Sequence, residues 1–344
     1  MMESFAMQLH ETLLRVAGWA PDDVVAEARA QLAAGNIAAT TRTLVFAGRR
    51  AVLPLTDDDM DLLEDLLVND DVDAQMLDRL AVGANEGLLL WRFAARLSGG
   101  DAPTDEVTDE ALVSGIEHDV WVRGIWRAWR SPIDDTPYPP PCLVYVVEVD
   151  DALAEPTAVV ELAGRLQRRL ISAGEAVPRV EVVSMHVDPP VYQQTARAFG
   201  QLVWSRTSSP TIAIARVFDK VDPVHGPSFD LDHPRMADEA ERRRTIDYLR
   251  AGTELLVSLG MVEDVIDPRR GIIVPMSFRT DGSWIWTDST AYYLEQYHLA
   301  PDAELLRHVQ GVDGPPARPD SVALQHAMST LTAPEIAEQA VWSL

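Results

Sequence analysis

Three β-branched runs separated by two helix-length segments constrain the fold of this 344-residue chain more than any other feature. The runs cover residues 143–149, 179–184 and 211–217, and amphipathic segments lie between them at 157–173 and 191–204. Strands that alternate with helices of this length favour a β-α-β-α-β unit around a parallel sheet. We therefore predict a contiguous central parallel sheet within a mixed α/β (α+β) chain.

The predicted strands end in polar residues, and such sheets often bind ligands at the carboxyl ends of their strands. Here those ends carry residues 148–151, 186–188 and 219–220, most of which are acidic. They could form an acidic cleft, or only the polar rim that every such sheet has. An enzyme that uses these carboxylates is accordingly one hypothesis for function.

Helical periodicity dominates the region before the sheet, and it recurs further along the chain. Thr56 and Asp59 have the spacing of a capping box at the start of one helix. The domains expected are an acidic helical domain at 1–117 and an α/β domain with a C-terminal hairpin-helix module at 118–344. Helices are predicted at residues 3–17, 21–32, 56–67, 87–97, 118–130 and 237–259.

The segment 118–130 is rich in tryptophan and arginine, and on a helix the two residue types would occupy adjacent arcs. Stacked aromatic side chains beside arginines are typical of single-stranded nucleic-acid binding. The net charge of −25 disfavours that function, because an acidic chain is repelled by phosphates. We therefore expect tryptophans in the core and arginines paired with carboxylates: Trp121, Trp126 and Trp129, and Arg123, Arg127 and Arg130.

An Asp-Gly pair between apolar runs predicts a β-hairpin at 271–286, because both residues tolerate the positive φ of its turn. Arg279 and Asp281 are expected to fix this turn. Trp284 and Trp286 should alternate between the core and a partly exposed face. Helices are predicted to follow the hairpin.

The hairpin and the residues that follow it also carry a resemblance. Residues 276–288, with Tyr292-Tyr293-Leu294 and Leu299-Ala300-Pro301, resemble a module of poorly characterised actinobacterial proteins. That module is associated with immunity-like proteins encoded near polymorphic toxins. The resemblance implies a binding function, and it implies no catalytic residue.

Several common classes of protein are disfavoured by absent motifs. The only lysine, Lys220, is not in a Walker loop, and the sequence has neither Gly-x-Gly-x-x-Gly nor Gly-x-Ser-x-Gly. A single cysteine, Cys142, excludes an intrachain disulfide framework. Without a signal peptide or a membrane-spanning apolar run, we expect a cytoplasmic protein that binds neither membranes nor nucleic acid.

A loop at residues 219–234 contains possible metal ligands: Asp222, His225, Asp230 and His233. Their spacing matches neither an EF-hand nor a known zinc pattern. We therefore expect no bound metal and no cofactor, and we retain a metal-dependent enzyme only as an alternative.

The acidic charge is concentrated. Residues 57–119 contain eighteen acidic residues and three arginines, a net charge of −15. Such a surface would speed encounter with a basic partner. The leading hypothesis is a non-catalytic, immunity-like or adaptor protein, and a structural subunit of a larger assembly is a third. The partner-binding residues expected are Asp57, Asp58, Asp61, Glu64, Asp70, Trp284 and Trp286.

Overall fold

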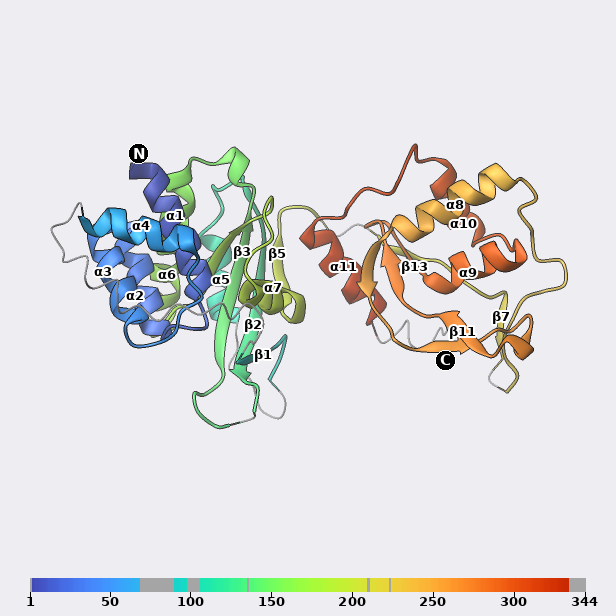
Figure 1. Cartoon of the computed structure of the whole chain (residues 1–344), viewed down its shortest axis with the longest axis horizontal. Coiled ribbons are helices and arrows are strands. Elements are labelled where there is room, and N and C mark those ends of the chain that lie inside the picture. The colour runs from blue at the N-terminus through green and yellow to red at the C-terminus, as the bar shows by residue number, and fades with distance from the viewer. Residues whose placement is uncertain are drawn as a thin grey trace. The chain divides into compact units, whose positions relative to one another are not determined.

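The computed structural model describes residues 2–68, 90–97, 106–134, 136–208, 211–222 and 224–333 (Figure 1). The chain divides into two compact units, Met1–Thr207 and Ser208–Leu344. Each unit contains both helices and sheets, so the expected mixed α+β class is confirmed. The division differs from the boundary expected at residue 117, because the N-terminal helices pack against the sheet domain that follows them.

The first unit combines a mostly helical N-terminal part with one sheet. In chain order its elements are α1 (Met2–Val16), α2 (Asp22–Ala33), α3 (Ile37–Gly48), α4 (Asp57–Val68), β1 (Trp91–Ala94), α5 (Glu106–Ser114), β2 (Val122–Pro132), β3 (Cys142–Val149), a 3₁₀ turn (Asp151–Leu153), α6 (Pro156–Ser172), β4 (Val180–Ser184), α7 (Val191–Phe199) and β5 (Gln201–Ser205).

The sheet of the first unit is centred on β2 and β3, which pair antiparallel along most of their length. On its other side β2 pairs antiparallel with both β1 and β5. Strand β4 pairs with β3 in parallel, and α6 is the crossover between them. The expected strand-helix-strand unit is therefore confirmed for β3, α6 and β4.

The third strand of that prediction is wrong. Within residues 211–217 only β6 (Ala213–Ile214) is a strand, and it pairs in parallel with a strand of the second unit. The helix predicted at 191–204 ends at Phe199, and the chain continues as β5. At Gly200 a Cβ would lie 2.6 Å from the Ala196 carbonyl and 2.8 Å from that of Arg127, so the turn from α7 into β5 requires glycine.

Residues 118–130 are also not helical, since most of them form β2. The aromatic and branched residues of this segment fit a strand as well as a helix, and pairing with β3 decides between them. As expected, the tryptophans are buried and the arginines bind carboxylates. Arg127 contacts Asp109, and Arg130 binds Asp22. In the segment predicted as a helix at 87–97, the described residues 91–94 form β1; residues 87–89 lie outside the description.

Helix α6 joins the N-terminal helices to the sheet. Its buried face contributes to the core on one side of β2 and β3, and it also contacts α1 and α2. At the crossing with α2, a Cβ on Gly164 would lie 2.3 Å from the Cβ of Ala33. The two helices can therefore approach this closely only because residue 164 is glycine.

The predicted capping box opens α4. The Thr56 amide donates to Asp59 Oδ2 over 2.9 Å, and the Asp59 amide donates to Thr56 Oγ1 over 3.2 Å. Two orphan donors at the helix start are thereby satisfied reciprocally. This prediction is confirmed.

The second unit is built from shorter elements. They are β6, β7 (Lys220–Asp222), β8 (Gly226–Ser228), α8 (Glu239–Ala251), β9 (Thr253–Leu256), β10 (Met261–Glu263), a 3₁₀ turn (Pro268–Arg270), β11 (Ile272–Pro275), β12 (Phe278–Thr280), β13 (Trp284–Thr287), α9 (Asp288–Tyr297), α10 (Ala303–Gln310) and α11 (Ser321–Leu331).

The predicted hairpin is confirmed next to its turn as β12 and β13, which pair antiparallel within a sheet of order β6-β13-β12-β9, whereas residues 272–275 form β11 and pair with β10 instead. Asp281 fixes the turn, because its Oδ1 accepts from the amides of Ser283 and Trp284, each over 2.8 Å. The helix predicted at 237–259 is too long. It ends at Ala251, and Gly252 lies against the ring of Trp286 where a Cβ would be 2.3 Å away.

Candidate ligand pocket

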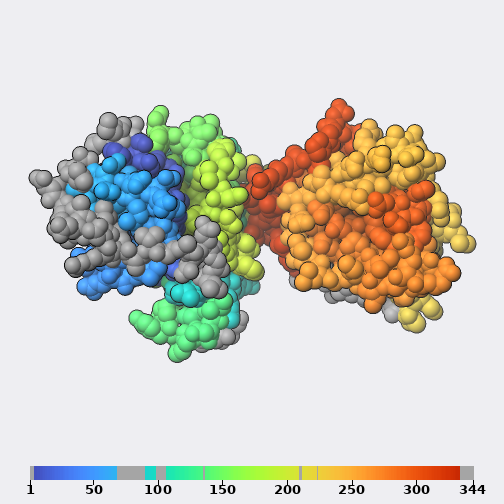
Figure 2. All heavy atoms as spheres, in the orientation of Figure 1, coloured from blue at the N-terminus to red at the C-terminus, as the bar shows by residue number. Residues whose placement is uncertain are grey.

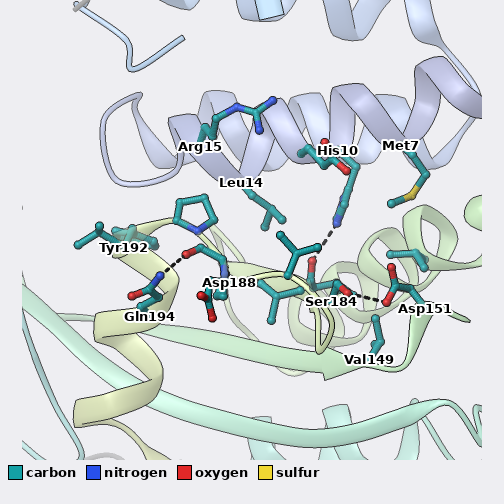
Figure 3. A pocket seen from close by; sticks show the side chains of 18 of the residues that line it. Met7, His10, Leu14, Arg15, Val149, Asp151, Ser184, Asp188, Tyr192 and Gln194 are labelled. Carbon is teal, nitrogen blue, oxygen red and sulfur yellow. Dashed lines mark hydrogen bonds between the residues drawn. The ribbon is translucent and has the colours of Figure 1, made fainter. Parts of the chain in front are cut away.

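A cavity of about 510 Å³ lies in the first unit, between α1 and the carboxyl ends of β3 and β4 (Figure 3). Helix α1 forms one wall, and the strand ends with the loop that leads into α7 form the opposite wall. Residues 54 and 56, just before α4, complete the lining. The cavity is thus at the edge where parallel strands commonly present ligand sites.

Helix α1 is held over the edge of β4 by its buried histidine. Among the described strands β4 pairs only with β3, and the Val182 carbonyl is on the other side of β4. His10 Nε2 lies 2.8 Å from this carbonyl oxygen and donates to it. An edge carbonyl that would otherwise be buried without a partner is thereby satisfied.

A buried network of polar side chains also joins α1, α2 and α7 to β4 near the His10 contact. Arg29 of α2 pairs with Glu181 of β4, and both side chains are only 2% exposed. Gln193 of α7 donates to the same carboxylate and to the Leu14 carbonyl, each over 2.8 Å. Helices from the start of the first unit and α7 near its end therefore meet at β4, next to the cavity.

The imidazole of His10 is uncharged at neutral pH. Burial lowers the pKa of His10 from 6.5 to about 4, and the nearby charge of Arg29 acts in the same direction, against the bond to Val182. Protonation would place a second positive charge beside Arg29 at a buried position. His10 thus contributes a hydrogen bond but no charge to this wall.

Arg15, the one arginine among the described residues of the lining, is paired within the protein. Its Nε donates to Asp59 Oδ2 over 2.8 Å, and its terminal nitrogen contacts Oδ1. Burial alone would raise the pKa of Asp59, but bonds from Arg15, Thr12 and Thr56 lower it below its usual value. The guanidinium charge is consequently matched by a buried carboxylate.

Polar groups gather where β3 and β4 end, as expected from the sequence. Ser184 Oγ donates to Asp151 Oδ1 over 2.6 Å, and His186 Nε2 lies 2.9 Å from Asp150 Oδ1. Hydrogen bonds from Arg123 and His186 lower the pKa of Asp150. Asp188 is exposed at the mouth of the cavity.

Some of the polar residues that the sequence predicted at these strand ends do not belong to this site. Glu148 is buried and pairs with Arg197 of α7. Residues 219–220 belong to the second unit, because the strand predicted before them is not part of this sheet.

Sequence reasoning missed the wall that α1 provides. Nothing in residues 3–17 distinguishes His10, Glu11 and Arg15 from polar residues on any amphipathic helix. The only signal was the apolar stripe of this helix. It predicts that the helix packs against another element, but it does not identify that element.

The acidic residues expected to bind a partner lie on the exposed face of α4. Asp57, Asp58, Asp61 and Glu64 are all exposed, whereas Asp70 lies outside the described residues. Figure 2 shows α4, in light blue, at the surface of the first unit.

The two hairpin tryptophans, also expected to bind a partner, differ in exposure. Trp286 is 1% exposed, and its Nε1 donates to the Leu249 carbonyl over 3.0 Å. Trp284 is partly buried beside His308. Trp286 is thus a core residue that a partner does not reach. Trp284 lies two positions earlier on the same face of β13 and packs against the same core, so the expected alternation of the two tryptophans between faces is wrong.

The four possible metal ligands of the 219–234 loop have separate contacts. Asp222 binds His225 across the β7–β8 turn, Asp230 pairs with Lys220, and His233 contacts Asp219. Among the residues that the structure describes, no group of three or more His, Cys, Asp or Glu side chains could hold a metal ion.

Comparisons with known proteins give no match to a family model, a curated protein or a solved structure. The resemblance of the hairpin module to immunity-like proteins therefore stays a prediction. None of the helices in the described part of the chain is both long and apolar enough to cross a membrane.

Proposed function

We propose that the chain is a non-catalytic binding protein whose ligand is a small molecule held in the pocket under α1. The observation that supports this proposal is an apolar-walled cavity of about 510 Å³ at the carboxyl ends of two parallel strands. Ligand pockets of roughly 300–1,000 Å³ with apolar walls and a few polar groups are the usual form of such sites.

The contacts of the polar lining favour binding over chemistry. The Ser184 hydroxyl donates to a carboxylate, and His10 donates to a backbone carbonyl. A serine nucleophile is usually activated by a neighbouring histidine or lysine base, whereas the side chain that Ser184 Oγ binds among the described residues is the Asp151 carboxylate. We therefore favour a binding function over the enzyme hypothesis.

A neutral apolar dye, Nile red, provides a direct test. Val187 lines the mouth and is 69% exposed, so Val187→Trp should obstruct the cavity without disturbing the core. Ile171 on α6 is comparably exposed and lies outside the lining, so Ile171→Trp is the matched control. We expect saturable binding to the unaltered protein and to Ile171→Trp, with at least a several-fold loss in Val187→Trp. Equal binding by all three would overturn the proposal.

A second candidate function, electrostatic association with a basic protein partner, is favoured by the exposed carboxylates of α4. Exposed charges accelerate encounter and are screened by salt beyond about 10 Å at 0.1 M. Changing Asp58, Asp61 and Glu64 to lysine should slow association with a basic probe protein, cytochrome c, at low salt. The free energy of unfolding should change by less than about 1 kcal/mol per site. An unchanged association rate would leave α4 with a solubilising role only.

A further inference from the structure

The charges that line the pocket are predominantly negative. Among the described residues of the lining, the acidic side chains are Glu11, Asp151 and Asp188, and the one arginine is Arg15. Glu11 and Asp188 are exposed, while Asp151 is half-buried at the end of β3. The carboxylates therefore surround the mouth from α1, from the strand end and from the loop before α7.

Neither of the basic side chains in the lining offsets this charge. The guanidinium of Arg15 is bound to Asp59, which is 1% exposed and lies behind the lining. His10 is neutral and donates to Val182. Within the described part of the lining, a ligand thus meets carboxylates without an unpaired cation beside them.

The orientation of one carboxylate is fixed. Ser184 Oγ donates to Asp151 Oδ1 over 2.6 Å, and the His186 amide donates to the same hydroxyl over 3.0 Å. Within the described residues, Asp151 Oδ2 accepts no hydrogen bond from the protein. An oxygen held in this way is a pre-oriented acceptor for an ammonium group.

The walls below the mouth are apolar. Leu14, Val149 and Val182 are buried and line the cavity, and Trp19 adds partly buried aromatic surface. An apolar body would bury its surface against these walls while a charged group stayed at the mouth. A ligand with both parts matches the two halves of the pocket.

We propose that the ligand is an organic cation: an apolar or aromatic body that carries a protonated amine, with its ammonium group at Asp151 and with the Asp188 carboxylate adding negative charge at the mouth. This inference rests on the proposed function of the pocket. An organic anion or a phosphate ester would face the same carboxylates with no unpaired cationic donor among the described lining residues, so charge selects against it. A metal ion needs several ligands at one point, and no such group is formed by the described residues.

Three probes of nearly equal shape test the charge preference: 2-(1-naphthyl)ethylamine, 2-(1-naphthyl)ethanol and 1-naphthylacetate, each titrated calorimetrically into the full chain. We expect the amine to bind about ten-fold more tightly than the alcohol, because a charge-assisted hydrogen bond contributes roughly that much. The acetate should bind most weakly. The advantage of the amine should shrink as salt is raised.

Variants of single carboxylates show which side chains cause the preference for the amine. Asp188→Asn and Asp151→Asn should each reduce amine affinity several-fold and leave alcohol affinity unchanged. Glu161→Gln, an exposed carboxylate of α6 outside the lining, is the matched control and should leave both unchanged. Asp188 has an exposed side chain, so its substitution keeps the test valid even where Asp151→Asn perturbs the Ser184 contact.

The possible outcomes separate the two proposals. If amine and alcohol bind with equal affinity and Val187→Trp loses both, the proposal of a cationic ligand is overturned and the proposed binding pocket is supported. Tighter binding of 1-naphthylacetate than of the amine would also overturn the proposal of a cationic ligand. Absence of saturable binding by all three probes and by Nile red would overturn both proposals.

Discussion

The two units each place a histidine at a contact between a helix and a sheet, in opposite electrostatic settings. His10 of α1 is fully buried and donates to a backbone carbonyl, whereas His308 of α10 is 28% exposed and lies 2.6 Å from the Asp281 carboxylate. The imidazole of His10 faces a neutral carbonyl and the nearby charge of Arg29, whereas that of His308 faces a carboxylate. The same residue type is therefore neutral and structural in one unit and matched to a negative charge in the other.

The ion pairs differ between the units in the same way. Arg29 and Glu181 are both 2% exposed and join α2 to the edge strand β4, while Arg250 and Glu295 join α8 to α9 at the surface. Removing one partner of a buried ion pair strongly lowers the free energy of unfolding, because the remaining charge stays buried without a counterion. The first unit thus depends on buried polar contacts to seat its helices, and the second does not depend on this exposed pair.

The largest expected effect tests the ion pairs directly. Arg29→Met should lower the free energy of unfolding by about 3–5 kcal/mol, since it leaves Glu181 buried without its cation. Arg250→Met should cost less than about 1 kcal/mol, because water replaces the lost partner. Urea unfolding of both variants measures the difference. A double variant, Arg29→Met with Glu181→Met, should recover much of the loss.

Equal losses in the two single variants would show that burial does not distinguish these pairs. No recovery in the double variant would show that Arg29 contributes through packing and its contact with Leu13 instead.

An intermediate effect concerns pH. The pKa of His10 is lowered from 6.5 to about 4, so between these values the unfolded chain binds a proton that the folded chain does not. Stability should therefore fall as the pH drops below about 6.5, by up to about 1.4 kcal/mol per pH unit until about pH 4. His10→Gln, which retains a donor for the Val182 carbonyl, should lack this component.

Urea midpoints of the unaltered protein and His10→Gln at pH 7, 6, 5 and 4 provide the measurement. The carboxylates with lowered pKa, such as Asp22 and Asp59, add further acid sensitivity in both proteins and cancel in the comparison. Parallel pH profiles would mean that His10 becomes protonated without cost in the folded state.

The smallest of these effects tests how closely α2 and α6 pack. Gly164→Ala adds a Cβ 2.3 Å from Ala33 and should cost about 1–3 kcal/mol through overpacking. In the second unit, Gly311→Ala places its Cβ no closer than 3.4 Å to another atom and should be nearly neutral. Thermal unfolding of the two variants compares them. A neutral Gly164→Ala would indicate that the two helices separate easily.

Local patterns accounted for the parts of the fold that the sequence predicted correctly. The capping box of Thr56 and Asp59 and the Asp281-Gly282 hairpin depend on neighbouring residues, so sequence alone determines them. The β3-α6-β4 unit also follows from sequence, because its alternating periods and its turn lengths permit one connection. The acidic strand end, with Asp150, Asp151 and Asp188, was predicted for the same reason.

Long-range pairing decided the rest. Residues 122–132 have a pattern that suits a helix or a strand, and they become a strand because β3 and β5 pair with them. Residues 213–214 look like a third parallel strand, yet their partner is β13, which lies about seventy residues later in the sequence. The pocket was equally hidden, since it exists only where His10 meets a carbonyl 172 positions away. Sequence specifies which surfaces are apolar, and only the tertiary structure specifies which of them meet.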